Sequence, residues 1–328
     1  MQNILEIKNL NIGFELQQGI AQAIYGVNLE LEKGGSLGLV GESGCGKSVT
    51  AMSIMKLLPK NAVISQGQIL FEGKNIISLS QKEMGQIRGR KIALIPQDPL
   101  TSLNPLYTIG DQILEAVKLH HKVSRKEAKN IAIEALKSVK IPEAEERFNN
   151  YPHEFSGGMR QRVIIAMALS CNPDLIIADE PTTALDVTVQ AQILSLIKDI
   201  QKERGTSLLL ITHDLGVVSE VCDRVAVMYA GRIVETADVK SIFKSPSHPY
   251  TQGLLDSLPA TGKDKLNPIK GQPPAVTEEI KGCPFNPRCP HAMDICRHVE
   301  PENIELTQGH RVACHLHKKN LHKDPTNS

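Results

Sequence analysis

Apolar residues follow two spacings along the chain, and together these spacings predict an alternation of strands and helices. Short apolar runs bounded by glycine, proline or polar residues predict strands at residues 4–10, 21–31, 36–40, 68–71, 91–96, 174–180 and 207–212. Apolar positions at helical spacing predict helices at residues 49–58, within 109–139, from 157 to about 171 and at 187–202. A hairpin around Ala230 and Gly231 is expected at 225–235.

The order of these elements predicts an α/β fold that carries a helical insertion. Strands that alternate with helices favour a parallel sheet covered by helices. One capping box begins at Ser80, before the strand predicted at 91–96, and a second begins at Ser124 within the helical stretch at 109–139, which interrupts this alternation. We therefore expect a helical subdomain at about 98–172 inside a first domain that spans 1–258. Because proline, glycine and lysine become dense near residue 259, a linker is expected at 259–281 and a small cysteine-rich module at 282–328.

A glycine-rich stretch lies between the predicted strand at 36–40 and the predicted helix at 49–58. It matches the phosphate-binding pattern G-x-x-x-x-G-K-[ST] and reads Gly41-Glu42-Ser43-Gly44-Cys45-Gly46-Lys47-Ser48, with Val49 next. The glycines let backbone N–H groups turn toward an anion, and the helix N-terminus adds partial positive charge. Lys47 would reach the outer phosphates and Ser48 would ligate magnesium, so this loop predicts a nucleoside triphosphate site.

Two carboxylates end the apolar strand predicted at 174–180. Charges at the end of a buried strand are costly unless they are paired or bound to a metal. Asp179 is therefore expected to hold magnesium, and Glu180 to activate the water that attacks the γ-phosphate. His213 follows the strand at 207–212 on the ligand side of the sheet, where it would contact the γ-phosphate or serve only as a capping or packing residue.

Two weaker candidates remain open on the residues alone. The turn Ser156-Gly157-Gly158 presents backbone N–H groups at a helix start, which would make a second anion site, but the same residues also suit an ordinary helix start. Phe14 is either a core or hairpin aromatic or a flat face on which an adenine ring stacks.

Composition excludes several classes of protein. The chain has 328 residues, 41% hydrophobic and 22% charged, which is ordinary for a folded soluble protein. A net charge of +1 provides no basic field that would favour nucleic acid. Apolar runs stay shorter than the ~18 residues of a membrane span, and the N-terminus lacks a secretion signal. We therefore expect a cytosolic chain in which disulfides do not form.

Six elements in a fixed order resemble the ATP-binding subunit of ABC transporters. They are the 41–48 loop, Gln97, the 155–159 turn, the strand ending at Glu180, the 184–186 segment and His213. The resemblance covers about residues 5–258 and implies a RecA-like P-loop core with an antiparallel β part and an inserted helical subdomain. Phe155 and Met159 depart from the leucine and glutamine that many members have, whereas Ser156 and both glycines are kept.

The resemblance also assigns roles to individual residues. It implies that Gln97 joins magnesium to the membrane partner, that Ser156, Gly157, Gly158 and Asp186 belong to the ATP-binding set, and that His213 is the switch histidine. Phe14 falls where the family stacks adenine. Catalysis would then rest on Lys47, Glu180 and His213, with Ser48, Gln97 and Asp179 around magnesium.

The mechanism that the resemblance implies is dimerisation driven by ATP. Two such domains would pack head to tail, so that the Ser156 turn of one covers the γ-phosphate held by the 41–48 loop of the other. Expected partners are two transmembrane permease subunits, a second homologous ATPase subunit and an extracytoplasmic substrate-binding protein. The chain would lie peripherally on the cytoplasmic face of the bacterial inner membrane.

The C-terminal cysteines narrow this resemblance. The chain resembles the C-terminal extension of oligopeptide/dipeptide and nickel importer ATPases at residues 247–251, 282–290, 296 and 313–315. Some of these ATPases hold a [4Fe–4S] cluster. Here the ligands would be Cys283, Cys289, Cys296 and Cys314. On the residues alone, four thiols in a short module suit an iron–sulfur cluster, Zn²⁺, or no metal at all, and the lack of C-x₂-C spacing disfavours zinc.

The sequence therefore predicts the ATP-hydrolysing subunit of a bacterial importer of dipeptides or oligopeptides. A nickel importer of the same family is the nearest alternative. A soluble ABC ATPase acting on ribosomes or DNA would be expected to have tandem ATP modules or a coiled-coil insert, which the chain lacks. A generic P-loop kinase would leave Gln97 and the Ser156 turn unexplained.

Overall fold

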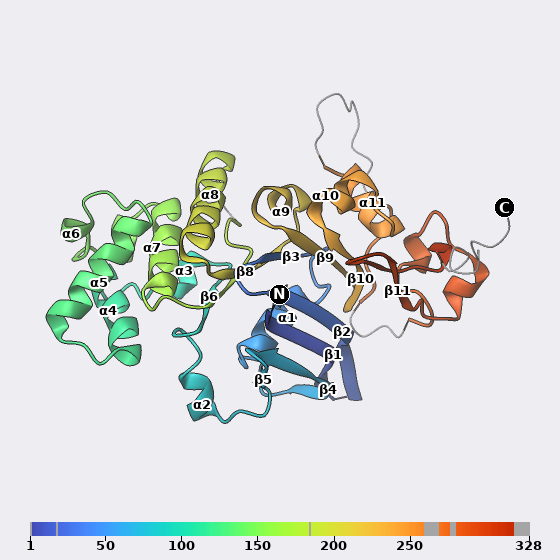
Figure 1. Cartoon of the computed structure of the whole chain (residues 1–328), viewed down its shortest axis with the longest axis horizontal. Coiled ribbons are helices and arrows are strands. Elements are labelled where there is room, and N and C mark those ends of the chain that lie inside the picture. Colours follow the sequence, from blue (N-terminus) through green and yellow to red (C-terminus); the bar gives the residue numbers. More distant parts are fainter. Residues whose placement is uncertain (1, 18, 184, 259–268, 276–279, 318–328) are drawn as a thin grey trace.

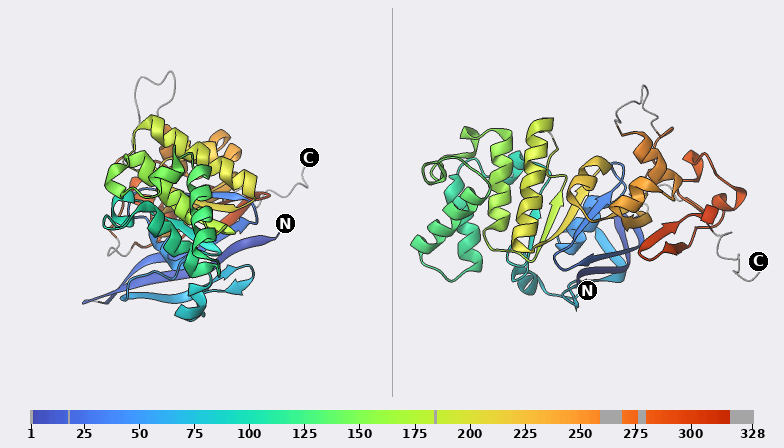
Figure 2. Two further views of the ribbon diagram at one scale, coloured as in Figure 1. Left: turned by 90° about the vertical axis from the view of Figure 1, so that its left-hand side faces the viewer. Right: turned by 45° about the horizontal axis from the view of Figure 1, so that its top comes forward.

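The computed structural model describes residues 2–17, 19–183, 185–258, 269–275 and 280–317. Within these residues the strands form an eight-stranded and a four-stranded sheet, with helices packed around them (Figure 1). The helices between β6 and β7 lie at one end of the molecule, and the cysteine-bearing residues 280–317, called the C-terminal segment below, lie at the other (Figure 2).

The larger sheet has the strand order β11-β12-β10-β9-β3-β8-β7-β6. Its parallel part contains β3 (Ser36–Val40), β6 (Ile92–Ile95), β7 (Leu175–Asp179), β8 (Ser207–Thr212) and β9 (Arg224–Tyr229). All residues of β3, β7 and β8 are buried, because helices or the second sheet cover both faces of a parallel sheet. The carboxyl ends of these strands therefore meet at one edge, where ligands bind in open α/β sheets.

An antiparallel extension completes this sheet through β10 (Arg232–Asp238), β11 (Asn303–Thr307) and β12 (His310–Ala313). The predicted hairpin is confirmed, since β9 and β10 pair antiparallel. Its turn uses Ala230 at φ 44° and Gly231 at φ 78°, the left-handed pair that tight hairpins need.

The smaller sheet is antiparallel, in the order β2-β1-β4-β5. It consists of β1 (Asn3–Leu16), β2 (Gly19–Glu32), β4 (Ala62–Phe71) and β5 (Lys74–Asn75). One core joins its buried apolar residues to the α1 helix (Lys47–Ile54) and to β3. The first two strands are longer than predicted, because register shifts interrupt the polar–apolar alternation that reveals a strand in the sequence.

The chain between β6 and β7 is helical in the described residues. It contains α3 (Pro99–Ser102), α4 (Ile109–His120), α5 (Arg125–Ser138), α6 (Ala144–Arg147), a 3₁₀ turn (Pro152–Glu154) and α7 (Gly157–Leu169). The capping boxes predicted at Ser80 and Ser124 are confirmed at the starts of α2 (Gln81–Gly85) and α5. The stretch predicted as helical at 109–139 consists of two helices, α4 and α5, which contact each other.

The remaining helices are α8 (Val187–Arg204), α9 (Leu215–Val221), α10 (Val239–Lys244) and α11 (Pro249–Asp256). The helix predicted at 49–58 was placed too late, because α1 begins at Lys47 directly after Gly46, whose φ of 108° turns the chain into it. It ends at Ile54, and Lys56 then adopts a left-handed φ of 50°. Among the described residues, no helix combines the length and apolar character that crossing a bilayer requires.

The C-terminal segment packs against the larger sheet. It contains two 3₁₀ turns (Asn286–Arg288 and Asp294–Arg297), and its strand β12 pairs with β10. The fully buried Glu235 carboxylate of β10 accepts hydrogen bonds from the backbone N–H groups of Ser247 (2.7 Å) and His248 (2.9 Å), and it contacts His310 Nε2 of β12 at 2.8 Å. Residues 259–268 and 276–279 of the predicted linker, and 318–328 of the predicted module, lie outside the described residues.

Candidate nucleotide-binding site

The predicted phosphate loop follows β3 at the carboxyl edge of the sheet and leads into α1. Two of its glycines are required by close packing. A Cβ added to Gly41 would lie 2.1 Å from Met228 O, and one added to Gly46 would lie 2.6 Å from Ile24 Cδ1. Only glycine fits these positions, so the sheets fix the loop from behind.

Lys47 extends back along the inside of this loop. Its ammonium nitrogen donates hydrogen bonds to Gly41 O at 2.8 Å and Glu42 O at 3.0 Å. The residue is only 5% exposed, so the loop carbonyls fix the position of its charge. A positive charge held at the mouth of a helix N-terminus is suited to the outer phosphates of a nucleotide.

Ser48 and Asp179 meet across the end of the sheet. The Ser48 hydroxyl donates to Asp179 Oδ1 at 3.2 Å. Burial raises the pKa of Asp179, and the Ser48 hydrogen bond opposes that shift. A hydroxyl and a carboxylate are the hard oxygen donors that Mg²⁺ prefers, and a divalent cation would offset the cost of burying the carboxylate. The residues present therefore fit magnesium.

Glu180 is the centre of a polar group next to Asp179. Its carboxylate accepts from Gln97 Nε2 at 2.9 Å and from the Thr183 hydroxyl at 3.0 Å, and it lies 3.4 Å from His213 Nδ1. Its backbone has a φ of 46°, which is uncommon for a residue other than glycine and is often found at functional sites. These contacts aim the carboxylate into the space in front of the loop.

One cavity of about 750 Å³ collects most of the predicted site residues. Its lining includes the predicted residues Phe14, Glu42, Ser43, Gly44, Gly46, Lys47, Ser48, Val49, Gln97, Glu180 and His213. Gly41, Cys45 and Asp179 lie directly behind this lining, within the loop or bonded to Ser48. Phe14 thus belongs to the cavity wall rather than to a closed core.

The Ser156 turn and Asp186 are not part of this cavity lining. Ser156 caps α7 by accepting from Met159 N, and Asp186 caps α8 by accepting from Val189 N at 2.9 Å. The two helix starts contact each other, because a Cβ on Gly158 would lie 2.5 Å from Val189 Cγ1. Ser156 and Gly157 are exposed, so this turn is a surface feature of the single chain.

Sequence reasoning missed several residues that shape the cavity. Ala23 of β2 and Leu254 of α11 line it, and Thr183 holds Glu180. The Tyr250 hydroxyl accepts a hydrogen bond from Glu42 N at 2.9 Å. Tyr250 falls within the 247–251 stretch noted in the sequence, but it lies 208 positions from Glu42, so no spacing in the sequence reveals this contact.

The four predicted cluster cysteines come from separate parts of the C-terminal segment. Burial raises the pKa of Cys283 and of Cys314 to about 11, and the charges of the neighbouring thiols add to both shifts. Cys283 is influenced by Cys289, Cys296 and Cys314, so the four sulfurs lie within electrostatic range of one another. Within the described parts of the chain, however, no group of three or more His, Cys, Asp or Glu residues is arranged to hold a metal ion.

Comparison with known proteins identifies the family. Residues 24–183 match the ABC transporter family, and residues 234–296 match the C-terminal region of oligopeptide/dipeptide transporters. The oligopeptide transport ATP-binding protein OppD of Bacillus subtilis is 54% identical over 325 residues, which cover 98% of this chain and 90% of that protein. This chain belongs to the oligopeptide/dipeptide family of ABC transporter ATP-binding subunits.

Two further similarities agree with this family. The dipeptide transport ATP-binding protein DppD of Bacillus subtilis is 52% identical and covers 96% of this chain, which spans 95% of that protein. A dimeric ATP-binding cassette in a post-hydrolysis state, bound to ADP and Pi, shares the fold with a TM-score of 0.65 and 29% identity, over 72% of this chain and 98% of that one. The chain thus has the ABC ATPase fold and is an ABC ATPase, for which ATP and Mg²⁺ are expected.

Proposed function

We propose that this ABC ATPase drives the import of dipeptides or oligopeptides through a bacterial membrane. The observation that carries the catalytic part is the convergence of Lys47, Ser48, Gln97, Glu180 and His213 on one cavity. Peptide cargo is supported by relatives of nearly equal length whose names state dipeptide and oligopeptide transport, and by the match over residues 234–296.

The chain's own residues divide the work of hydrolysis. The 41–49 loop binds the phosphates, with Lys47 next to the outer ones, and Phe14 offers its ring to the adenine. Glu180 accepts a proton from the attacking water, and Gln97, Thr183 and His213 orient its carboxylate. Ser48, Gln97 and Asp179 would hold magnesium, which when bound would neutralise charge on the transferring phosphoryl group.

The Ser156 turn acts on the nucleotide of a second ATPase subunit. Ser156 and Gly157 are exposed at the start of α7 and are not part of the chain's own cavity lining. A partner cassette docked head to tail would bring its phosphates to these N–H groups, and Asp186 lies beside them at the start of α8. The partner is a homologous ATPase subunit, and both bind two transmembrane permeases on the cytoplasmic face of the inner membrane.

We also propose that Cys283, Cys289, Cys296 and Cys314 hold a [4Fe–4S] cluster in a terminal module formed by residues 282–328. All four cysteines come from the C-terminal segment, and Cys283 and Cys296 are buried. The lack of C-x₂-C spacing among these cysteines disfavours a single Zn²⁺.

Reconstitution tests the transport function. We would place this ATPase, its companion ATPase, the two permeases and the binding protein in proteoliposomes, and measure ATP hydrolysis and uptake of a labelled peptide. Peptide should stimulate both, while Ni²⁺ should stimulate neither. Stimulation by Ni²⁺ alone would favour the nickel importer, and activity without permeases that responds to ribosomes would overturn the transport proposal.

Metal analysis tests the cluster separately. Anaerobically purified protein should be brown and contain about four irons per chain. Cys289→Ser should lose most of this iron, whereas Cys171→Ser, which removes a buried thiol of the ATPase core, should retain it. Colourless protein with stoichiometric zinc would overturn the cluster.

A further inference from the structure

An arginine of the C-terminal segment reaches the phosphate loop. Arg288 donates from Nη1 to Glu42 Oε2 at 2.6 Å and from Nη2 to Glu42 Oε1 at 2.9 Å. This is the parallel two-bond pairing that fixes both partners in one plane. The Arg288 side chain is only 5% exposed, and Glu42 is the second residue of the loop and part of the cavity wall.

All five N–H donors of Arg288 are used. Besides Glu42, the guanidinium donates from Nη1 to the Tyr229 hydroxyl at 3.3 Å, from Nε to Lys270 O at 3.0 Å and from Nη2 to Gly271 O at 3.2 Å. The guanidinium carbon of Arg288, Cζ, lies 5.7 Å from the centre of the Tyr229 ring and 6.0 Å from the centre of the Phe285 ring. A guanidinium saturated in this way has one orientation, so it positions Glu42 rather than following it.

Two further hydrogen bonds hold the backbone of Glu42 in the phosphate loop. Glu42 N donates to the Tyr250 hydroxyl, and Glu42 O accepts from Lys47 Nζ. Tyr229, Tyr250 and Phe285 pack as one aromatic group, with ring centres 4.6 to 5.4 Å apart. The position of Lys47 therefore depends on a residue that the C-terminal segment fixes.

The Arg288–Glu42 ion pair also changes the charge that the cavity wall presents to a nucleotide. Glu42 places a carboxylate on the wall of a cavity that receives polyphosphate, where it would repel the ligand. The Arg288 charge offsets it and draws the carboxylate toward the C-terminal segment. An acidic residue in a phosphate loop is thus compatible with nucleotide binding because a distant arginine neutralises it.

We propose that Arg288 is a positioning residue of the ATP site, through which the cysteine-bearing C-terminal segment sets how tightly the phosphate loop holds nucleotide. The proposal rests on the proposed role of the 41–49 loop. Arg288 immediately precedes Cys289 in the chain, and the 3₁₀ turn Asn286–Arg288 lies between Cys283 and Cys289. Whatever holds Cys289 in place therefore also determines whether the guanidinium reaches Glu42.

Nucleotide binding by the purified chain measures this role. Arg288→Ala should raise the dissociation constant for a fluorescent ATP analogue about tenfold, because it leaves the Glu42 carboxylate uncompensated near the phosphates. Arg288→Lys should weaken binding less, since it keeps the charge but not the two-bond geometry. In ATPase assays the KM should rise while kcat changes by less than about twofold.

A second substitution, at Glu42, separates the effect of the uncompensated charge on nucleotide affinity from the effect of a disturbed structure. Adding Glu42→Gln to Arg288→Ala should recover part of the lost affinity, because it removes the uncompensated carboxylate while the loop stays without its anchor. If the double variant bound as weakly as Arg288→Ala, or if Arg288→Ala bound normally, the proposal would be overturned. A Lys47→Ala chain that binds like the wild type would instead refute the loop assignment itself.

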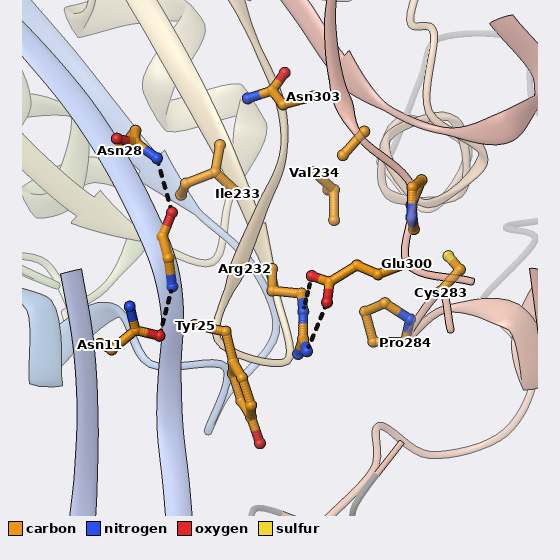
Figure 3. A pocket seen from close by; sticks show the side chains of 13 residues that line it. Asn11, Tyr25, Asn28, Arg232, Ile233, Val234, Cys283, Pro284, Glu300 and Asn303 are labelled. Atoms are coloured by element: carbon orange, nitrogen blue, oxygen red, sulfur yellow. Dashed lines mark hydrogen bonds and ion pairs between the residues drawn. The ribbon is translucent and has the colours of Figure 1, made fainter. Parts of the chain in front are cut away.

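A matched control lies in another ion pair of the C-terminal segment, between Arg232 of the larger sheet and Glu300. Arg232 of β10 donates to Glu300 at 2.5 Å and stacks 3.8 Å from the Tyr25 ring centre, beside a separate cavity of about 350 Å³ (Figure 3). Neither Arg232 nor Glu300 lines the nucleotide cavity. Glu300→Gln should leave nucleotide affinity unchanged, and a tenfold loss in this variant would show that any loosening of the segment suffices, against a specific role for Arg288.

Coupling to the cysteines is tested by a double-mutant cycle. Cys289→Ser should weaken nucleotide binding, and adding Arg288→Ala should change affinity little further, because both act through the bond to Glu42. Independent, multiplicative effects, or unchanged binding in Cys289→Ser, would refute transmission from the cysteine segment through Arg288.

Discussion

The phosphate loop and the Ser156 turn are both glycine-containing helix starts, yet their surroundings are opposite. The loop is backed by two sheets, and Lys47, Ser48, Asp179, Tyr250 and Arg288 fix it from within the same chain. The Ser156 turn presents Ser156 and Gly157 to solvent, and it is held mainly through its own helix and α8. The proposed phosphate site is thus enclosed within the single chain, while the Ser156 turn lacks walls that would give it a ligand of its own.

This difference shows which step each region controls. Nucleotide binding should depend on residues that pack behind the loop, because they set its geometry before ATP arrives. Under the proposed head-to-tail pairing, turnover should depend in addition on the exposed turn, because its N–H groups would contact the nucleotide of a second subunit. Substitutions in the two regions should therefore separate binding from hydrolysis.

The largest effect is expected at Glu180. Glu180→Gln keeps the size and the hydrogen bonds of the side chain but cannot accept a proton, so ATP turnover should fall by roughly 10²–10⁴. Nucleotide affinity should change little, and ATP should accumulate in stable dimers visible by light scattering. Turnover near the wild-type rate would remove Glu180 from the role of base.

Lys47→Ala should abolish most nucleotide binding in the single chain. Charge-assisted hydrogen bonds to phosphate contribute about 1.5–3 kcal/mol, so affinity should fall by roughly 10 to 150-fold. Equilibrium binding of a fluorescent ATP analogue measures this. Unchanged affinity would mean that the loop is not the phosphate site and that the comparison between the two glycine turns fails.

Gly157→Asp tests the exposed turn. A Cβ at this position would meet Leu185 at an ordinary 3.7 Å, so the side chain fits the single chain without distortion. Its carboxylate would repel the partner's phosphates, and turnover should fall by about tenfold or more. Nucleotide affinity of the single chain should stay within about twofold, with Gly157→Ala as the uncharged control. Equal loss of binding would show that the turn serves its own chain's nucleotide.

The smallest effect concerns acid stability. Burial lowers the pKa of His248 from 6.5 to about 3, with a further contribution from His317. Its Nδ1 accepts from Tyr250 N and so begins the helix that supports Glu42. Between pH 6.5 and about 3 the unfolded chain binds a proton that the folded chain does not, so the free energy of unfolding should fall as pH falls through this range.

His248→Asn checks that prediction. Asparagine can still cap the helix but does not titrate, so urea unfolding of this variant should lose less stability between pH 7 and pH 4.5 than the wild type does. Identical losses in both proteins would mean that other groups account for the acid sensitivity of the fold.

The parts of the site that could be predicted are those whose signal is local. The phosphate loop, the carboxylates after β7, the capping boxes and the β9–β10 hairpin are each encoded within about ten residues, and turn chemistry or helix capping explains them. The cavity then gathers residues that share the carboxyl edge of one sheet, which follows from strand order.

Long-range packing could not be predicted in the same way. Arg288 pairs with Glu42 across 246 positions, and Arg288 resembles any surface arginine in a proline-rich stretch. The strands β11 and β12 are short, and they add to a sheet whose edge is formed far earlier in the chain. Such contacts depend on the tertiary packing of distant segments, and local sequence patterns do not encode this packing.

The pairing of β12 with β10 makes residue 258 a poor place to cut the chain. A fragment that ends there would leave the outer side of β10 with unbonded N–H and C=O groups, and the buried Glu235 would lose its histidine neighbour. An unprotected strand of this kind recruits other strands. A truncated ATPase would therefore be expected to self-associate in solution, although it keeps the whole of residues 24–183 that match the ABC transporter family.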